Sequence, residues 1–343
     1  MGYADVIDGL SVDLLPDIAC VERQQWQELL ARGDTNVVYL TREWLLTWWD
    51  VYRRGQLLIP AVRKDNEIVA FTPLFADDGM VYFVGSGHGS DYMDFIGDIS
   101  NPNVLDALLT TARGHVDDFI GFRFYFIPER SRTGEFLRQA AKRLNLEFDD
   151  EGEMPAPVLN FDRSGAGEAA VNKKSLRRHE RFFERAGELE AREWRRGDEI
   201  LPHLDEFFEQ HVARWQSTPS PSRFLKEKHR EFYRRLTRAA SDAGWLRFTR
   251  IEWQSRAIAM HFGFCYDDSF LWYKPTFAID LARHSPGEVL LRRLLVAAIN
   301  EGASAFDFGI GGEAFKHRFA TATPVVRTWG LYAPGRRGER HRE

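Results

Sequence analysis

The sequence predicts an α/β fold with mixed (α+β) sheets, built from two similar halves. Each half contains amphipathic helical stretches, then a meander of short strand-like segments, then a strand–helix–strand crossover. The chain of 343 residues has room for two domains of ordinary size. A stretch rich in glycine and proline, EGEMPAPVLNFDRSGAG, lies between the halves and is the best candidate for a linker. We therefore expect one domain over residues 1–160 and a second over 161–343.

In the first half, the hydrophobic periodicity predicts helices near 22–32, 41–53, 104–117 and 134–144. Strands are expected in GQLLIPAVRK, EIVAFTPLF, MVYFVG and GFRFYFIP, and near 145–150. A glycine-rich loop, GSGHGSDYMDF, separates the meander from the crossover.

In the second half, helices are expected at 173–187, 198–216, 224–243 and 287–301. The segments WLRFTRIEW, AIAMHFGFCY and SFLWYKPTFAI predict three antiparallel strands joined by tight turns. A strand in ELEAREW, a short strand in SAFDF and a last strand in VVRTWGLY complete this half.

The composition restricts the classes of function. A net charge of −5 and a pI of about 6.1 argue against a dedicated nucleic-acid binder with a basic surface. The two cysteines, Cys20 and Cys265, are far apart, which suggests a reducing compartment and gives no zinc site of the usual spacing. The N-terminal segment has no secretory pattern, and no apolar run approaches the length of a membrane span. We expect a cytoplasmic protein without a bound metal.

The stretch AFDFGIGGEAFKHRF at 305–319 resembles several nucleotide motifs, but the rest of the chain does not support them. A kinase DFG needs an upstream HRD catalytic loop and a glycine-rich loop with its lysine, and the sequence contains neither. A dinucleotide fingerprint needs a following helix, a second strand and an acid about 20 residues later. Near position 330 the chain reads VVRTWGLYAP, without an acid.

A better candidate for anion binding lies upstream, in RHSPGEVLLRRLL. Ser285 suits an N-cap and Pro286 the first helical position, so the N–H groups from Gly287 onward would point out of the helix start. Such N–H groups bind phosphates. The alternative is a capping box in which Ser285 and Glu288 occupy these donors and only start the helix.

The order of these segments resembles that of a known family. The marks are VAFTPLF, VGSGHGSDYMDF, KKSLRRHERFFERAGELE, HVARW, AIAMHFGF, SPGEVLL and FDFGIGGEAFKHRF. Together they resemble the BioF2-like, or CelD-type, acetyltransferases of the GNAT superfamily, which are relatives of the Fem-type aminoacyl-tRNA-dependent peptidyl transferases. The resemblance implies two tandem GNAT-like domains packed around a cleft, in which an acyl group passes to an amine or hydroxyl.

The resemblance also implies the donor site. In the GNAT fold, the loop between the fourth strand and the next helix holds the pyrophosphate of acyl-CoA. Here that loop is expected at His284, Ser285, Pro286, Gly287 and Glu288. Ordinary GNAT enzymes carry R/Q-x-x-G-x-G/A at this place, whereas this chain has a single glycine. Acyl-CoA, in particular acetyl-CoA, is the expected donor, and aminoacyl-tRNA is the alternative.

Four residues of the second half are candidates for catalysis. The resemblance implies that Lys316, in an F-K-x-x-F pattern, stabilises the developing oxyanion, as suits an ammonium in a dry cleft. Asp307 alternates with two phenylalanines and is either an ion-pair partner of Lys316 or a base. His261 has small period-2 neighbours and is either a general base or a core histidine. Tyr273 on the next strand is a candidate general acid.

Further residues are candidates for binding the acceptor or donor. In GSGHGSDYMDF, Asp91, Tyr92 and Asp94 would hold an amine or sugar hydroxyls, or the loop is only a solvated turn; His88 lies in the same loop. Arg177 lies on the basic helix KKSLRRHERFF, which is either a solvated face or a contact for a phosphorylated substrate. Arg214 and Trp215 end a helix that would line the same cleft.

Three functions are therefore considered. The first is direct transfer from acyl-CoA to a small-molecule, sugar or envelope-pathway acceptor, which needs no enzyme nucleophile. The second is Fem-type amide formation from aminoacyl-tRNA. The third is a GNAT fold that binds without catalysis.

Overall fold

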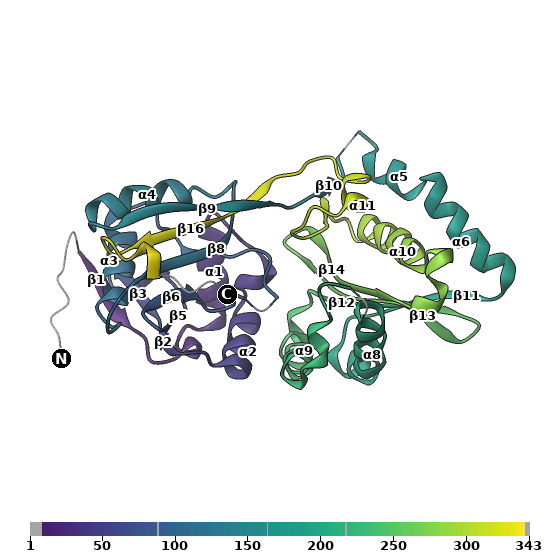
Figure 1. Cartoon of the computed structure of the whole chain (residues 1–343), viewed down its shortest axis with the longest axis horizontal. Helices are drawn as coiled ribbons and strands as arrows, with labels where there is room; N and C mark the ends of the chain where they lie inside the picture. The colour runs from purple at the N-terminus through teal and green to yellow at the C-terminus, as the bar shows by residue number, and fades with distance from the viewer. Residues whose placement is uncertain (1–8, 88, 163, 217, 340–343) are drawn as a thin grey trace. The chain divides into compact units, whose positions relative to one another are not determined.

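The computed structural model describes residues 9–87, 89–162, 164–216 and 218–339 (Figure 1). It divides into two units, one formed by residues up to Pro155 together with those from Pro324, the other by Ala156–Thr323. The division differs from the expected one at the end of the chain, because the residues after Thr323 return to the first unit. The predicted mixed α/β fold is confirmed.

The first unit contains two sheets. Its helices are α1 (Arg23–Arg32), α2 (Arg42–Tyr52), α3 (Pro102–Arg113) and α4 (Thr133–Arg143). One sheet has the order β1 (Leu10–Leu14), β3 (Pro60–Lys64), β4 (Glu67–Phe71), β7 (Ile96–Gly97). The other has the order β2 (Gln56–Leu58), β5 (Leu74–Asp77), β6 (Met80–Phe83), β8 (Gly121–Pro128), β16 (Val325–Tyr332), β9 (Glu147–Pro155).

The strand β16 lies between β8 and β9, pairing antiparallel with both. Leu331 and Tyr332 on this strand are fully buried. The pairing also explains why β9 extends to Pro155, through part of the segment whose composition predicted a linker. Backbone N–H and C=O groups of that segment find partners on a strand that is distant in sequence.

The second unit is built on one sheet of six strands. The order is β10 (Val158–Asn160), β15 (Ala305–Asp307), β14 (Ser269–Phe277), β13 (Arg256–Tyr266), β12 (Leu246–Trp253), β11 (Leu189–Trp194). The longer helices are α6 (Lys174–Ala186), α8 (Leu204–Trp215), α9 (Glu227–Ala239) and α10 (Pro286–Asn300), and the short ones are α5 (Ala166–Val171), α7 (Gly197–Ile200) and α11 (Ala314–His317). Pro202 falls in a 3-10 turn that separates α7 from α8, within the single helix expected at 198–216.

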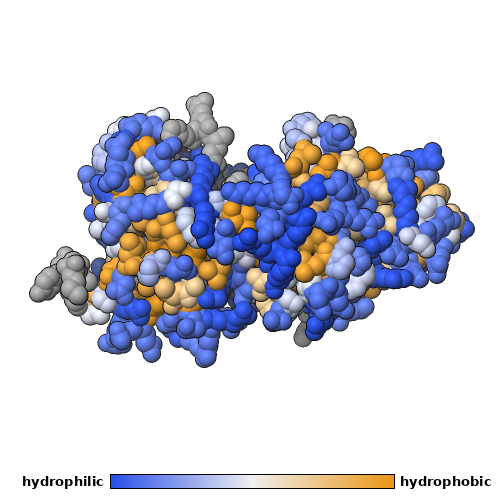
Figure 2. All heavy atoms as spheres, turned by 90° about the horizontal axis from the view of Figure 1, so that it is seen from below, coloured by the Kyte–Doolittle hydropathy of each residue, from blue (hydrophilic) through white to orange (hydrophobic). Residues whose placement is uncertain are grey.

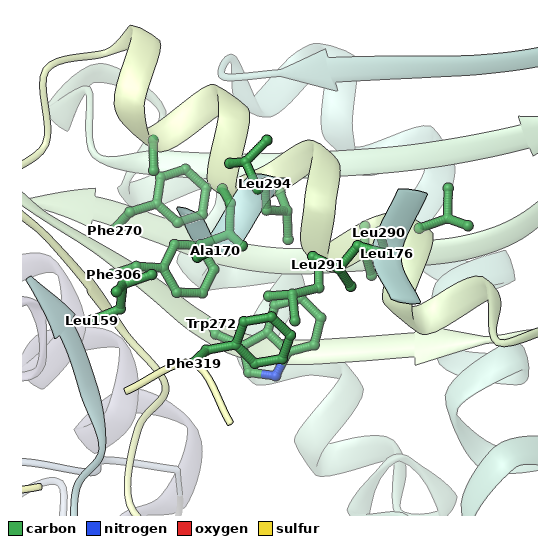
Figure 3. Close-up of a cluster of buried hydrophobic side chains, with 14 of the residues drawn as sticks. Leu159, Ala170, Leu176, Phe270, Trp272, Leu290, Leu291, Leu294, Phe306 and Phe319 are labelled. Carbon is green, nitrogen blue, oxygen red and sulfur yellow. The ribbon is translucent and has the colours of Figure 1, made fainter. Parts of the chain in front are cut away.

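Helices cover both faces of this sheet: α5, α6 and α10 lie on one face, and α8 and α9 on the other (Figure 1). The core under α10 forms because apolar side chains recur at helical spacing and meet aromatic rings from β14 and β15. Leu291 and Leu294 of the helix face Phe270, Trp272 and Phe306 of the sheet (Figure 3).

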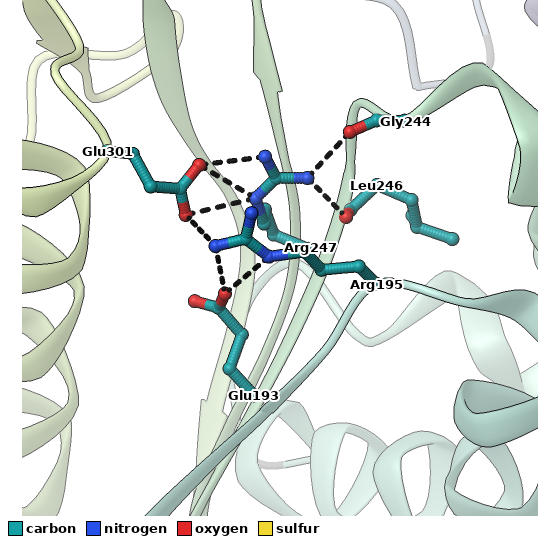
Figure 4. A network of polar contacts seen from close by, with 6 residues as sticks. All are labelled: Glu193, Arg195, Gly244, Leu246, Arg247 and Glu301. Carbon is teal, nitrogen blue, oxygen red and sulfur yellow. Dashed lines mark hydrogen bonds and ion pairs between the residues drawn. The ribbon is translucent and has the colours of Figure 1, made fainter.

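A polar network ties the end of α10 to the strands β11 and β12 (Figure 4). The Arg247 guanidinium donates to Glu301, with NH2 to Oε2 at 2.7 Å, and to the carbonyls of Gly244 and Leu246 at 2.8 Å each. Arg195 reaches the same Glu301 carboxylate at 2.8 Å. These cations hold the pKa of Glu301 below its usual value despite burial, which alone would raise it.

The surface differs between the two units on the face drawn in Figure 2, where apolar side chains gather over the first unit and hydrophilic ones predominate over the second.

Candidate functional site

The centre of the second unit's sheet contains an irregularity. Between Phe262 and Phe264 the pairing of β13 with β14 shifts by one residue, so that β14 carries a bulge. The parallel pairing of β14 with β15 covers only Ser269 to Leu271, whereas β14 continues to Phe277. The second half of β14 therefore leaves its ladder with β15 where the bulge begins.

His261 lies at this bulge and is fully buried. Its Nε2 accepts a hydrogen bond from the backbone N–H of Tyr273 at 3.1 Å. The ring lies over Gly263, where a Cβ would come within 2.0 Å of the imidazole Cε1. Burial lowers the pKa of His261 to about 3, so the imidazole is neutral near pH 7. The imidazole therefore holds the bulge through its Nε2, and its role as a general base or as a core histidine stays a prediction.

Tyr273 follows on β14 and turns to the α9 side of the sheet. Its hydroxyl is 2.9 Å from the Tyr233 hydroxyl of α9. The ammonium of Lys274 lies 4.2 Å from the centre of the Tyr273 ring. Tyr273 is therefore held at both its backbone N–H and its hydroxyl.

The end of α8 brings a half-buried cation next to β14. Arg214 donates from NH1 to the Pro275 carbonyl at 2.7 Å, and its guanidinium lies 4.3 Å from the centre of the Phe277 ring. Burial lowers its pKa to about 10, and it makes no ion pair with an acid in the described parts of the chain. Trp215 beside it has a buried indole N–H for which no described residue is an acceptor. A half-buried guanidinium without a carboxylate is suited to an anionic or strongly polar ligand.

Two neighbours of Arg214 on α8 were missed from the sequence. His211 is largely buried, and its Nδ1 is 2.8 Å from the Ser222 hydroxyl. Burial, and then the nearby Lys274 and Arg214 charges, lower its pKa to about 3. The Gln210 side chain donates to the Ala257 carbonyl at 3.0 Å. Their helical spacing from Phe207 was visible in the sequence, but it is equally typical of core positions.

The start of α10 does not form the capping box. Ser285 adopts the left-handed conformation, with φ 55°, and its side chain makes no cap hydrogen bond. The Glu288 carboxylate turns away to Arg318, at 3.0 Å. Pro286 is the first helical residue, and a Cβ on Gly287 would lie 3.2 Å from the Phe277 ring. Since Arg214 lies over the same ring, Phe277 joins the end of α8 to the start of α10.

Asp307 and Lys316 meet at the glycine turn after β15. Asp307 Oδ1 accepts from the Gly309 N–H at 2.7 Å. Lys316 is buried, and its Nζ donates to the carbonyls of Ile310 at 2.8 Å and Gly309 at 3.4 Å. The ion pair that the structure gives Lys316 is with Glu313, at 2.9 Å. Both residues therefore hold the backbone of the turn.

The remaining candidates of the second unit, Arg177 and His284, lie on α6 and just before α10. Arg177 is exposed on α6. The His284 ring stacks on Phe182 of the same helix, with centroids 4.0 Å apart and planes at 10°.

The loop candidates Asp91, Tyr92 and Asp94 belong to the first unit. Asp94 is buried and accepts from Thr35 at 2.6 Å, Thr133 at 2.7 Å and the Phe95 N–H at 2.9 Å. Burial raises its pKa more than these hydrogen bonds lower it. Tyr92 is buried against Tyr39, with ring centroids 5.9 Å apart. Asp91 is half-buried, and His88 lies outside the described residues.

The described residues contain no group of three or more His, Cys, Asp or Glu side chains that could hold a metal ion. None of the helices in the described ranges has the length and apolar character needed to cross a membrane.

The comparisons with known proteins agree with this architecture. Residues 171–317 match the family model of the acetyltransferase (GNAT) domain. No curated protein sequence matches the chain.

Solved structures match over nearly the whole chain. FemX is similar with a TM-score of 0.64 at 10% identity, covering 90% of this chain and 96% of FemX. L-PGS from Bacillus licheniformis has a TM-score of 0.56 at 11% identity, covering 92% of each chain. A tandem GNAT protein from the clavulanic acid biosynthesis pathway has a TM-score of 0.52 at 12% identity, covering 94% of this chain and 98% of that one. The chain therefore has a GNAT/Fem-like fold of two tandem GNAT-like units, and its residues 171–317 match the acetyltransferase (GNAT) domain.

Proposed function

We propose that this protein transfers an acyl group, in particular acetyl, from acyl-CoA to an amine or hydroxyl of a small-molecule, sugar or envelope-pathway acceptor. The observation that carries the proposal is the departure of β14 from β15 after Leu271, in the part of the strand whose last residue, Phe277, lies beside Gly287 at the start of α10. A pantetheine chain carries amide groups that pair with a strand backbone, and the second half of β14 offers such a backbone.

The start of α10 supports the same donor. Ser285 gives no side-chain cap, and the Glu288 carboxylate is held by Arg318. Neither of these two side chains therefore occupies the backbone N–H groups of the helix start that a phosphate would use. The helix N-terminus favours a negative group through its N–H groups and its dipole. In this proposal the segment from His284 to Glu288 binds the pyrophosphate.

The chemistry is a direct transfer. The acceptor nitrogen or oxygen attacks the thioester carbonyl, the new C–N or C–O bond forms, the C–S bond breaks, and the departing thiolate takes a proton. The proton lost by the acceptor balances the one gained by the thiolate. Tyr273, fixed at the bulge by His261, is the candidate acid for the thiolate, and Asp307 is the candidate base. Lys316 donates to the Gly309 and Ile310 carbonyls in the turn that follows Asp307, and it is the candidate for stabilising the developing oxyanion.

The half-buried Arg214 indicates the chemical character of the substrate. Its guanidinium lacks an acidic partner in the described ranges and lies beside the end of β14. We assign it, with Trp215, to binding an anionic or carbonyl group of the acceptor or of the bound donor. Asp91, Tyr92 and Asp94 remain proposed acceptor contacts from the first unit.

The test is donor binding followed by transfer. CoA or acetyl-CoA at a concentration about a hundred times its Kd should stabilise the protein by about 2.7 kcal/mol and raise the Tm. Release of free CoA thiol in the presence of an amine and hydroxyl acceptor panel then measures transfer. An unchanged Tm at millimolar CoA and acetyl-CoA contradicts the proposal.

A second function is favoured by the similarity to FemX. In this alternative, the donor is an aminoacyl-tRNA and the product an amide. Binding of charged tRNA with a steep salt dependence, without binding of CoA, would support it. Absence of binding by both donors would support the third function, a GNAT-fold binding module that does not catalyse a reaction.

A further inference from the structure

The exposed face of α6 forms an open groove of about 570 Å³. Its volume lies in the range typical of small-ligand sites, roughly 300–1,000 Å³. Five cations line the groove over three helical turns: Lys174, Arg177, Arg178, Arg181 and Arg185.

These cations are not neutralised by the acids of their own helix. Glu180 turns to α10, where it pairs with Arg292 and, at 2.6 Å, with Arg293 Nε. Glu184 lies 3.9 Å from the same Arg293. Glu180 and Glu184 are the acids that could screen the stripe if α6 were only a solvated face.

Within the described parts of the chain, four of the five cations make no ion pair or hydrogen bond: Lys174, Arg177, Arg181 and Arg185. The fifth, Arg178, contacts the imidazole Nε2 of His179 at 3.3 Å. Elsewhere the protein pairs exposed arginines with acids, as Arg256 with Asp280 at 2.7 Å and Arg192 with Glu190 at 2.7 Å. Like charges spaced i, i+4 destabilise a helix. The stripe is therefore a local excess of positive charge suited to an anion.

An aromatic ring lies within this stripe. Phe182 is 39% exposed, and the His284 ring at the start of α10 stacks on it. Arg178 and Arg185 lie one helical turn before and after Phe182, and all three side chains line the same groove. A flat ring between guanidinium groups is suited to a nucleobase that carries phosphates.

The size and charge of the site favour a single nucleotide over a nucleic acid strand. The stripe from Lys174 to Arg185 is about 16 Å long at about 1.5 Å per residue. It contains one exposed aromatic ring, and the chain as a whole carries a net charge of −5. A nucleic-acid channel instead presents several stacking rings along an extended basic surface.

We propose that the α6 groove binds the 3′-phosphoadenosine end of acyl-CoA, with adenine stacked on Phe182 and the 3′-phosphate held by Arg178 and Arg185. The inference rests on the proposed function. Because His284 joins Phe182 to the start of α10, the adenosine continues directly from the pyrophosphate at Gly287. The groove selects 3′-phosphorylated CoA as the donor.

The test compares CoA with dephospho-CoA, which lacks only the 3′-phosphate, by calorimetric titration of the whole protein. We expect CoA to bind the wild type at least tenfold more tightly. In the double variant Arg178→Gln and Arg185→Gln, the affinity for CoA should fall to that for dephospho-CoA, which should itself change little. Phe182→Ala should weaken both ligands by about the same factor, roughly tenfold.

The control is the double variant Arg235→Gln and Arg238→Gln on α9, which removes the same charge from the other face of the sheet. It should bind both ligands as the wild type does. All substituted side chains are exposed, so the fold should persist, and the Tm of each variant checks this.

The outcomes separate the two proposals. Equal affinity of the wild type for CoA and dephospho-CoA overturns the inference but leaves the acyl-CoA donor intact. A preference for CoA that survives in the α6 double variant also overturns it, because the 3′-phosphate then lies elsewhere. If neither form binds and single-stranded RNA binds instead, both the inference and the acyl-CoA donor fail.

Discussion

At position 261, a fully buried imidazole accepts a backbone N–H, and burial lowers its pKa from 6.5 to about 3. The unfolded chain therefore binds more protons than the folded protein between these two values. Stability linked to His261 is present above pH 6.5 and is lost as the pH falls toward 3. His211, whose pKa is also lowered to about 3, acts in the same direction.

This predicts a pH dependence that one substitution reduces. Between pH 6.5 and pH 5, the free energy of unfolding of the wild type should fall by about 1.5 kcal/mol more than that of His261→Gln. Urea denaturation at each pH measures it. His317→Gln, at an exposed position, is the control and should follow the wild type. Parallel curves for wild type and His261→Gln would show that the imidazole titrates normally.

Lys316 gives a second prediction at the scale of one residue. Lys316→Met removes the donor to the Gly309 and Ile310 carbonyls, and should lower the free energy of unfolding by about 1–3 kcal/mol. Glu313→Gln, at a half-exposed partner, should cost less than about 1 kcal/mol. Denaturant midpoints measure both. Wild-type stability of Lys316→Met together with lost turnover would instead assign the ammonium to the reaction itself.

Sequence patterns identified candidate site residues more easily than the roles of these residues. Small period-2 neighbours marked the place of His261, and the structure shows that Gly263 makes room for the imidazole. Whether that room serves a ligand or a ring depends on the bulge in β14, which leaves no mark in the spacing of residues. Phe182 looked like one of many helix phenylalanines, because its exposure depends on the packing of α6 against α10.

At the scale of elements, the network around Glu301 joins α10 to β11 and β12. Glu301→Gln should leave the Arg247 guanidinium, whose side chain is 7% exposed, without a carboxylate. Removing one partner of a buried pair costs about 3–5 kcal/mol, and we expect a loss near the lower value because Arg247 keeps two carbonyl acceptors.

The control for this prediction is Glu190→Gln, whose partner Arg192 is exposed. It should change the free energy of unfolding by no more than about 0.5 kcal/mol. Urea denaturation of the two variants at pH 7 makes the comparison. Equal losses in the free energy of unfolding would contradict the stabilising role assigned to the buried Glu301 network.

Most elements follow from local pattern. The spacing of apolar residues in α10 and the tight turns between β12, β13 and β14 are sufficient to predict those elements. The capping box that the sequence offered as one alternative at Ser285 does not form. Ser285 takes a left-handed conformation that frees its side chain from the cap, and Glu288 finds Arg318, 30 residues later.

At the scale of the whole molecule, the strands that pair with β16 could not be predicted from the sequence pattern. The segment VVRTWGLY predicts a strand correctly, but not the sheet that receives it. β16 connects β9 to the rest of its sheet, because β9 pairs with β16 at the edge of the strand order. A strand's partner depends on long-range complementarity, which a single sequence does not display.

This topology predicts the effect of a truncation. A chain ending at Thr323 lacks β16, so β9 loses its ladder and the first unit should lose its cooperative unfolding transition. Limited proteolysis should then degrade residues up to 155 and spare 156–323. A chain ending at Pro334 keeps β16 and should resist as the full chain does. Equal resistance of both truncated chains would contradict the role given to β16.

The same strand orders events during synthesis. The second unit is continuous from Ala156 to Thr323, whereas the first unit is incomplete until β16, which begins at Val325, has been synthesised. At about 5–20 residues per second, the ribosome needs roughly ten to thirty seconds to pass from the end of β9 to β16. During that interval the edges of β8 and β9 lack their common neighbour, and such edges are templates for wrong pairing. The unit that contains the earlier residues is therefore the one completed last.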